Sequence, residues 1–159
     1  MKPRQFRSAV PTAIRLSGFA AALALASSAS GQTWSGGAGG TYDWNNSSNW
    51  SAAVTPSSTA ALSFGGSTGL SNNNNFTAAS SFGSITFAAA AGSFTLGGNS
   101  ITLGNTGGGA GTIITNSSGT TQTINNAIAL NPGQKNIVGS SGATTIINGT
   151  INYGTGRLF

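Results

Sequence analysis

The chain of 159 residues contains no His, no Cys and no Glu, and its only acidic residue is Asp43. General acid–base catalysis and nucleophile activation depend on ionisable side chains. Zinc and iron sites depend on His or Cys, and glycoside cleavage normally depends on two carboxylates. The composition therefore argues against an enzyme and predicts a protein with no catalytic residue, no metal site and no cofactor.

Positive charge is concentrated at the N-terminus. The chain has six Lys and Arg residues and a formal net charge of +5, but beyond the first fifteen residues only Lys135 and Arg157 remain. A surface that binds phosphates needs several clustered cations. We therefore expect no nucleic-acid partner, and we assign the basic character to a targeting segment.

Residues 1–31 have the three parts of a secretory signal peptide. A cationic start is followed by an apolar run from Leu16 to Ala26 and by small residues from Ser27 to Gly31. The apolar run is shorter than the roughly 20 residues that span a bilayer. We predict that this segment engages the export machinery, so that the mature chain is secreted or displayed at the cell surface. The alternative is an amphipathic N-terminal helix of a cytosolic protein.

A tryptophan-rich segment follows at residues 32–66. It contains every tryptophan of the chain, Trp34, Trp44 and Trp50, together with Tyr42. Arrays of repeats need an atypical end segment that shields the first repeat, so we interpret this segment as an N-terminal cap. The alternative is an aromatic platform that binds sugars through these four residues. No acid or amide cluster marks a site for sugar hydroxyls, which favours the cap.

From residue 60 onward the sequence alternates short β-like runs with turn residues. The expected strands are 61–64, 84–88, 93–96, 100–103, 112–115, 121–124, 127–130, 136–138, 144–147 and 150–153. The polar tract Asn72–Asn75 is expected to be a loop. Without disulfides and with few charges, stability must come from backbone pairing and apolar burial.

Residues 114–133 and 137–156 form an internal repeat with an offset of 23, and nine of their twenty positions are identical. This period suits one turn of a β-solenoid, in which equivalent residues stack about 4.8 Å apart. A third, weaker copy would align Ile101 with Ile124. A competing interpretation is a local hairpin of residues 144–153 with a turn at Asn148-Gly149.

The repeat predicts which side chains stack on one another. Asn125 and Asn148 are expected to stack at a corner of the solenoid. The expected inward ladders, in which each buried Ile contributes roughly 1.5–3 kcal/mol, are Ile114/Ile137, Ile124/Ile147 and Ile128/Ile151.

The motifs resemble a known family. The segment Trp34–Ser51 reads W-S-G-G-x-G-G-T-Y-D-W-N-x-x-x-N-W-S, Ala61–Gly66 reads A-x-x-F-G-G, and a Gly/Asn/Thr-rich array begins at Ser84. Together they resemble the N-terminal region of bacterial proteins with autotransporter-associated β-strand repeats. The resemblance implies a right-handed parallel β-helix passenger at the outer membrane, acting as a structural stalk or adhesin.

Two departures from that family affect the expected organisation. The repeat core of the family is present only in part, at Leu96–Asn99, and no C-terminal translocator follows in this sequence. We therefore expect a fragment whose coils stack with downstream repeats. The expected order is a signal peptide at 1–31, a cap at 32–66 and an all-β solenoid at 67–159. The alternative function is a secreted module that binds extracellular polysaccharide or a host matrix surface through the tryptophan-rich segment.

Overall fold

The computed structural model describes residues 31–104, 109–154 and 157–158, so the predicted signal peptide lies outside the described residues. Strands dominate this part of the chain, and the only helices in it are two short 3-10 turns, η1 (Ser47–Asn49) and η2 (Ser51–Ala53). No helix among the described residues is long and apolar enough to cross a membrane.

Twelve strands make four successive coils, where a coil is one turn of three strands. Coil 1 is β2 (Ala61–Phe64), β3 (Ser71–Asn74) and β4 (Ser80–Phe82), and coil 2 is β5 (Ser84–Phe87), β6 (Thr95–Gly98) and β7 (Ile101–Leu103). Coil 3 is β8 (Gly111–Asn116), β9 (Thr121–Ile124) and β10 (Ile128–Leu130), and coil 4 is β11 (Gln134–Gly139), β12 (Thr144–Ile147) and β13 (Ile151–Asn152). Strand β1 (Gln32–Trp34) precedes coil 1, and β14 (Arg157–Leu158) follows coil 4.

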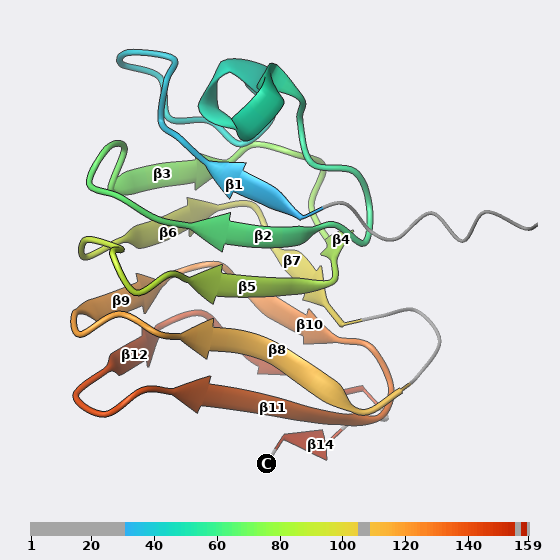
Figure 1. Cartoon of the computed structure of the whole chain (residues 1–159). Coiled ribbons are helices and arrows are strands. Elements are labelled where there is room, and N and C mark those ends of the chain that lie inside the picture. The colour runs from blue at the N-terminus through green and yellow to red at the C-terminus, as the bar shows by residue number, and fades with distance from the viewer. Residues whose placement is uncertain (1–30, 105–108, 155–156, 159) are drawn as a thin grey trace, which may run out of the picture.

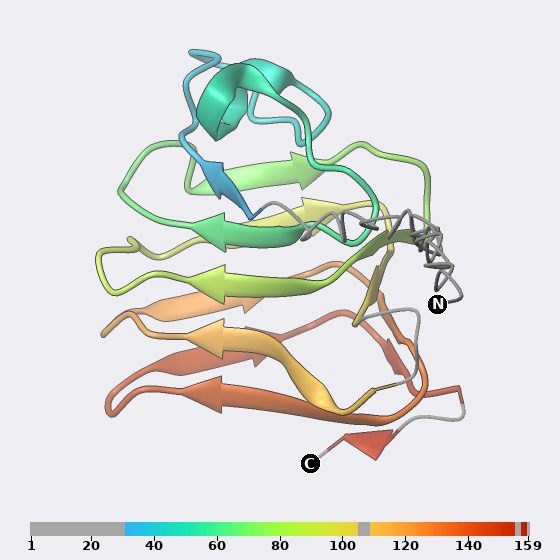
Figure 2. The same cartoon turned by 45° about the vertical axis from the view of Figure 1, so that its right-hand side comes forward.

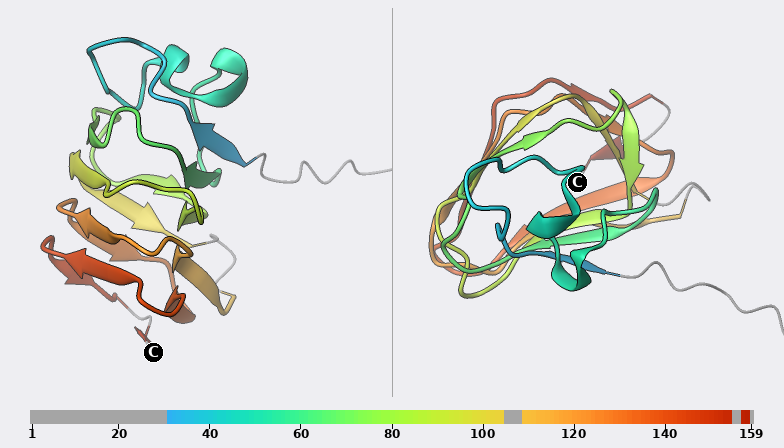
Figure 3. Two further views of the ribbon diagram at one scale, coloured as in Figure 1. Left: turned by 60° about the vertical axis from the view of Figure 1, so that its left-hand side comes forward. Right: turned by 90° about the horizontal axis from the view of Figure 1, so that it is seen from above.

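Equivalent strands of successive coils pair in parallel and build three sheets, β1-β2-β5-β8-β11-β14, β3-β6-β9-β12 and β4-β7-β10-β13. Strands of the first sheet run one way at the front, and those of the second return behind them (Figure 1). Seen from above, the chain circles clockwise as it descends from the cap to the C-terminus (Figure 3). The predicted all-β, right-handed parallel β-solenoid is therefore confirmed.

The predicted 23-residue register is present between coils 3 and 4. All three predicted ladders occur as paired positions in neighbouring strands, at Ile114/Ile137, Ile124/Ile147 and Ile128/Ile151. Strands β12 and β13 pair in parallel with the preceding coil and not with each other. The hairpin interpretation of residues 144–153 is therefore wrong.

The weaker third copy was placed in the wrong register. Ile101 pairs with Ile128, 27 residues later, and not with Ile124, which pairs with Leu96. The connection between β7 and β8 is longer than the connections that precede β5, β11 and β14 in the first sheet. Extra residues in a loop leave strand pairing intact, but they shift the sequence period.

Local composition also failed to predict several strands. The tract expected to be a loop at Asn72–Asn75 begins inside β3, which pairs with β6, and Asn72 and Asn74 are buried with hydrogen bonds to Trp44 and to Asn99 O. Strand β2 belongs to the first sheet, so the solenoid begins within the segment that we assigned to the cap. Strands β1, β4 and β14 have no strong apolar pattern and also form because they pair with adjacent strands.

The interior changes from aromatic to polar along the solenoid axis. One ladder of the first sheet keeps apolar residues in every coil, at Leu62, Ile85, Ile114 and Ile137. Two residues further along the same strands, the ladder reads Phe64, Phe87, Asn116 and Gly139. The largest buried side chains are therefore concentrated near the N-terminal end.

Candidate functional surfaces at the two ends

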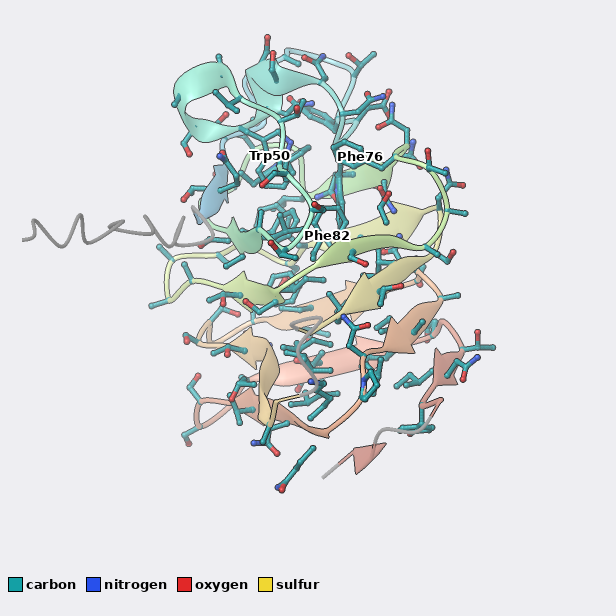
Figure 4. The ribbon with its side chains drawn as sticks, turned by 90° about the vertical axis from the view of Figure 1, so that its right-hand side faces the viewer. Trp50, Phe76 and Phe82 are labelled. Atoms are coloured by element: carbon teal, nitrogen blue, oxygen red, sulfur yellow. The ribbon has the colours of Figure 1, made fainter. Side chains whose placement is uncertain are left out.

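The three tryptophan rings form one cluster above coil 1. Trp50 packs edge-to-face against Trp34 and Trp44, with ring centroids 5.1 and 6.3 Å apart. All three rings also contact Phe64 at centroid distances of 5.7–5.9 Å. Such pairs add about 0.5–1.5 kcal/mol each beyond the area that they bury. Trp50, Phe76 and Phe82 are labelled at the upper end of the solenoid in Figure 4, where Phe82 packs against Trp44 and Phe76 at centroid distances of 5.8 and 5.9 Å.

Each indole N–H of this cluster has a hydrogen-bond acceptor. Trp34 Nε1 donates to Thr68 O at 3.1 Å, and Trp44 Nε1 donates to Asn72 Oδ1 at 2.8 Å. Trp50 Nε1 donates to Trp44 O at 2.6 Å. Buried polar atoms are costly unless they are paired, so these bonds allow the rings to be buried and attach the cap to coil 1.

The position of these rings bears on the sugar-platform interpretation. Trp34, Trp44 and Trp50 have exposed fractions of 2%, 0% and 2%, and Tyr42 is half-buried against the same core. Stacking on a sugar requires an exposed ring face, and the three tryptophans offer none. The structure brings all four predicted site residues together, but as the interior of a cap and not as a platform.

The cap covers the N-terminal edge of each of the three sheets. Trp34 of β1 also forms an antiparallel bridge with Trp50. Beside β1, Ser35 N–H donates to Asn49 O at 2.8 Å. At β3, Trp44 N–H donates to Asn73 O and Asn73 N–H donates to Tyr42 O, both at 2.9 Å. At β4, Thr59 N–H donates to Ser81 O at 3.0 Å. Figure 3 shows the cap crossing the top of the solenoid. Sheet edges that are already paired cannot accept further strands.

Asn49 organises the cap, although the sequence analysis did not single it out. Its fully buried side chain donates from Nδ2 to Thr41 O (2.8 Å) and Asp43 O (3.0 Å) and accepts from Ala38 N–H (3.0 Å). The Asp43 carboxylate accepts from Asn73 Nδ2 at 2.8 Å, which ties the cap to β3. The sequence feature that could have indicated this role is the position of Asn49 directly before Trp50 in the motif.

Asparagines line the corner between the second and third sheets. Asn148 Nδ2 donates to Asn125 Oδ1 at 2.9 Å, so the predicted stack at this corner is confirmed. An inner pair was not predicted: Asn74 and Asn126 both donate to Asn99 O, at 2.8 and 2.9 Å. Amide side chains therefore connect successive coils at this corner without any charge.

A buried polar group holds coil 3 to both of its neighbours. Gln122 accepts from Phe94 N–H and donates to Gly92 O, both at 2.8 Å in coil 2. Asn116 donates to Thr144 O of coil 4 at 3.0 Å. Both side chains are fully buried. Because these bonds form only in one alignment of the coils, they fix the register where the aromatic core ends.

Lys135 lies inside the protein. Its side chain is 1% exposed, and Nζ donates to Gly109 O at 2.7 Å. The stem passes beneath Gly104, whose φ of +100° and close approach to Lys135 suit glycine alone. Lys135 therefore anchors one end of the long β7–β8 connection from below.

The C-terminal end of the solenoid is covered far less. Within the described part of the chain, β12 and β13 are paired on one side only, and β14 pairs with β11 at two positions. We define the coil-4 end as the outer edges of β12 and β13 with the half-buried side chains Ile137, Ile147 and Ile151. This end is the one place in the described structure where strand edges and core side chains are accessible together.

No family model matches the chain, and no curated protein or solved structure is significantly similar to it. The interactions open to the protein therefore follow from the chemistry of its own surfaces. These surfaces offer backbone edges, hydroxyls and amides, which act through shape and hydrogen bonding.

Proposed function

We propose that the protein is an exported, non-catalytic β-solenoid passenger that acts as a structural stalk or adhesin at the bacterial cell surface. The observation that carries the proposal is a stack of coils with a covered N-terminal end and an accessible C-terminal end. Such a stack suits a scaffold that holds other parts of a protein at a distance.

The outer face of the first sheet is consistent with this role. Its outward positions form a ladder of small, mostly hydroxyl-bearing side chains, Thr33, Ser63, Thr86, Thr115 and Val138. Identical hydroxyls can stack rung upon rung, whereas identical charges would repel one another. An uncharged face of this kind interacts through many weak hydrogen bonds, which suits contact with an extracellular polysaccharide or a host matrix surface.

Two features of the sequence support the proposed location. Residues 1–31 have the pattern of a signal peptide, and the motif at Trp34–Ser51 resembles surface passengers. The scarcity of ionisable side chains supports a mechanism based on geometry. All catalytic classes that need paired carboxylates, His or Cys lack their residues in this chain.

The test is to locate the native protein in its cell. An antiserum raised against residues 114–153 is applied to cytosolic, outer-membrane and culture-fluid fractions, with a cytosolic enzyme as the control for lysis. We expect the antigen in the outer-membrane or culture-fluid fraction, with residues 1–31 removed when its N-terminus is sequenced. Antigen confined to the cytosol with an intact N-terminus contradicts the proposal.

A further inference from the structure

We propose that the coil-4 end is a docking surface for one further β-solenoid coil, continuous with β14 and parallel to coil 4. This inference deepens the proposed function, because it rests on the interpretation of the molecule as a stacked scaffold. It names the partner of that scaffold by its chemistry: a strand–turn–strand coil with apolar side chains at its inward positions.

The unpaired strand edges of coil 4 support this proposal first. Each coil from 1 to 3 is hydrogen-bonded along all three strands to the coil that follows it. In the described part of coil 4, only β11 has a following partner, and that partner is the short strand β14. The outward-pointing N–H and C=O groups of β12 and β13 therefore form a template for parallel strand addition.

Burial of the core ladders gives the second argument. Ile114, Ile124 and Ile128 of coil 3 are 0–2% exposed, because coil 4 covers them. Their partners in coil 4 are Ile137, Ile147 and Ile151, which are only half-buried. A coil stacked on coil 4 would bury these three side chains as completely as coil 4 buries those of coil 3, at roughly 25 cal/mol per Å² of apolar area removed from water.

The register of β14 gives the third argument. It pairs Arg157 with Gln134 and Leu158 with Lys135, which is an offset of 23 residues. The same offset relates Thr121 to Thr144 between coils 3 and 4. Strand β14 therefore has the direction and phase of a further coil, which makes the new contact continuous with the existing one.

Asn148, at the corner of coil 4, indicates which side chain the partner coil should carry there. The side chain of Asn148 stacks on Asn125 of the preceding coil, and Asn148 is exposed to solvent. A residue 23 positions later that carries an amide or hydroxyl could continue this stack. Lys135 is buried inside coil 4 and donates to Gly109 O, so its ammonium group is not available to a partner at the coil-4 end.

A second copy of the chain fits this surface less well than a continuous coil. A copy that approached with its N-terminal end would find β1, β3 and β4 already paired by its own cap. A copy that approached with its C-terminal end would have to accommodate two β14 strands in the contact. Covalent continuity with β14 avoids both conflicts.

The test extends the mature chain by a copy of residues 137–154 attached directly after Phe159, so that each copied residue falls 23 positions after its original. The control carries the same eighteen residues in shuffled order. We expect hydrogen exchange of the β12 and β13 amides that point away from coil 3 to slow at least tenfold in the extended chain only. The midpoint of thermal unfolding should rise in the same protein.

Three outcomes would overturn the proposal. Exchange that stays unchanged would show that the surface does not accept a coil, and equal slowing by the shuffled extension would show that register is irrelevant. The third outcome is concentration-dependent dimerisation of the unextended chain with protection of the same amides, which would make a second copy the partner. These measurements use purified protein, so a failure here is separable from a failure of the cellular location.

Discussion

The two ends of the described solenoid are built from the same kind of coil and are covered to different extents. At the N-terminal end, residues 34–60 cover the edges of all three sheets and place three tryptophans over the core. At the C-terminal end, two described edges stay unpaired and the last isoleucines are half-buried. Termination therefore needs its own sequence, because the repeat alone leaves an accessible edge (Figures 1 and 2).

Substitution of an aromatic residue should show the largest difference between the two ends in the loss of unfolding free energy. Trp44 is fully buried against Trp50, Phe64 and Phe82, so Trp44→Ala should lower the free energy of unfolding by about 3–5 kcal/mol. Urea denaturation followed by circular dichroism measures this loss. The matched variant at the other end is Tyr153→Ala, which removes a side chain that is 40% exposed and should cost less than about 0.5 kcal/mol. Equal losses would refute the distinction between the ends.

The isoleucine ladder allows the same comparison between adjacent coils. Ile124 is fully buried and its stacking partner Ile147 is half-buried. We expect Ile124→Ala to cost about 2–4 kcal/mol and Ile147→Ala about half as much, because less apolar area leaves water at Ile147. Urea denaturation of both variants under identical conditions measures the ratio of the two losses of unfolding free energy. A larger loss at Ile147 would mean that the coil-4 end is covered in solution.

A tight contact at the asparagine corner predicts a steric effect in coil 4. A Cβ atom on Gly149 would overlap the backbone carbonyl of Asn126, so Gly149→Ala should cost about 1–3 kcal/mol. Gly119 has open space at its Cβ position, and Gly119→Ala should be neutral or slightly stabilising. Thermal unfolding of the two variants tests this contrast, and similar midpoints would show that coil 4 is loosely stacked.

The smallest expected effect is the response of the cap to sugars. Buried rings should give blue-shifted tryptophan emission that does not move when polysaccharide is added, since no ring face is exposed. A titration with soluble polysaccharides, with Trp50→Phe as the control, measures this response. Ligand-dependent quenching that is lost in Trp50→Phe would restore the sugar-platform interpretation.

The sequence predicted the parts of the fold that depend on local pattern. Ile-rich runs in a 23-residue repeat predicted the register of coils 3 and 4, and the asymmetric distribution of tryptophan predicted the cap. Strand β3 was missed because Asn72 and Asn74 are buried by partners 28 and 25 residues away. Lys135 and Gln122 were missed for the same reason, since a polar residue gives no local sign that a distant backbone carbonyl will accept from it.

The gradient from an aromatic to a polar core also has a mechanical consequence. Tension applied between the two termini loads the inter-coil ladders one after another, so the least-buried coil separates first. Among the four described coils we expect coil 4 to separate first, and its release would lengthen the chain by about 80 Å for 23 residues at full extension. The tryptophan end would stay folded through that event, so a stretched molecule would yield in steps and re-form from its intact end.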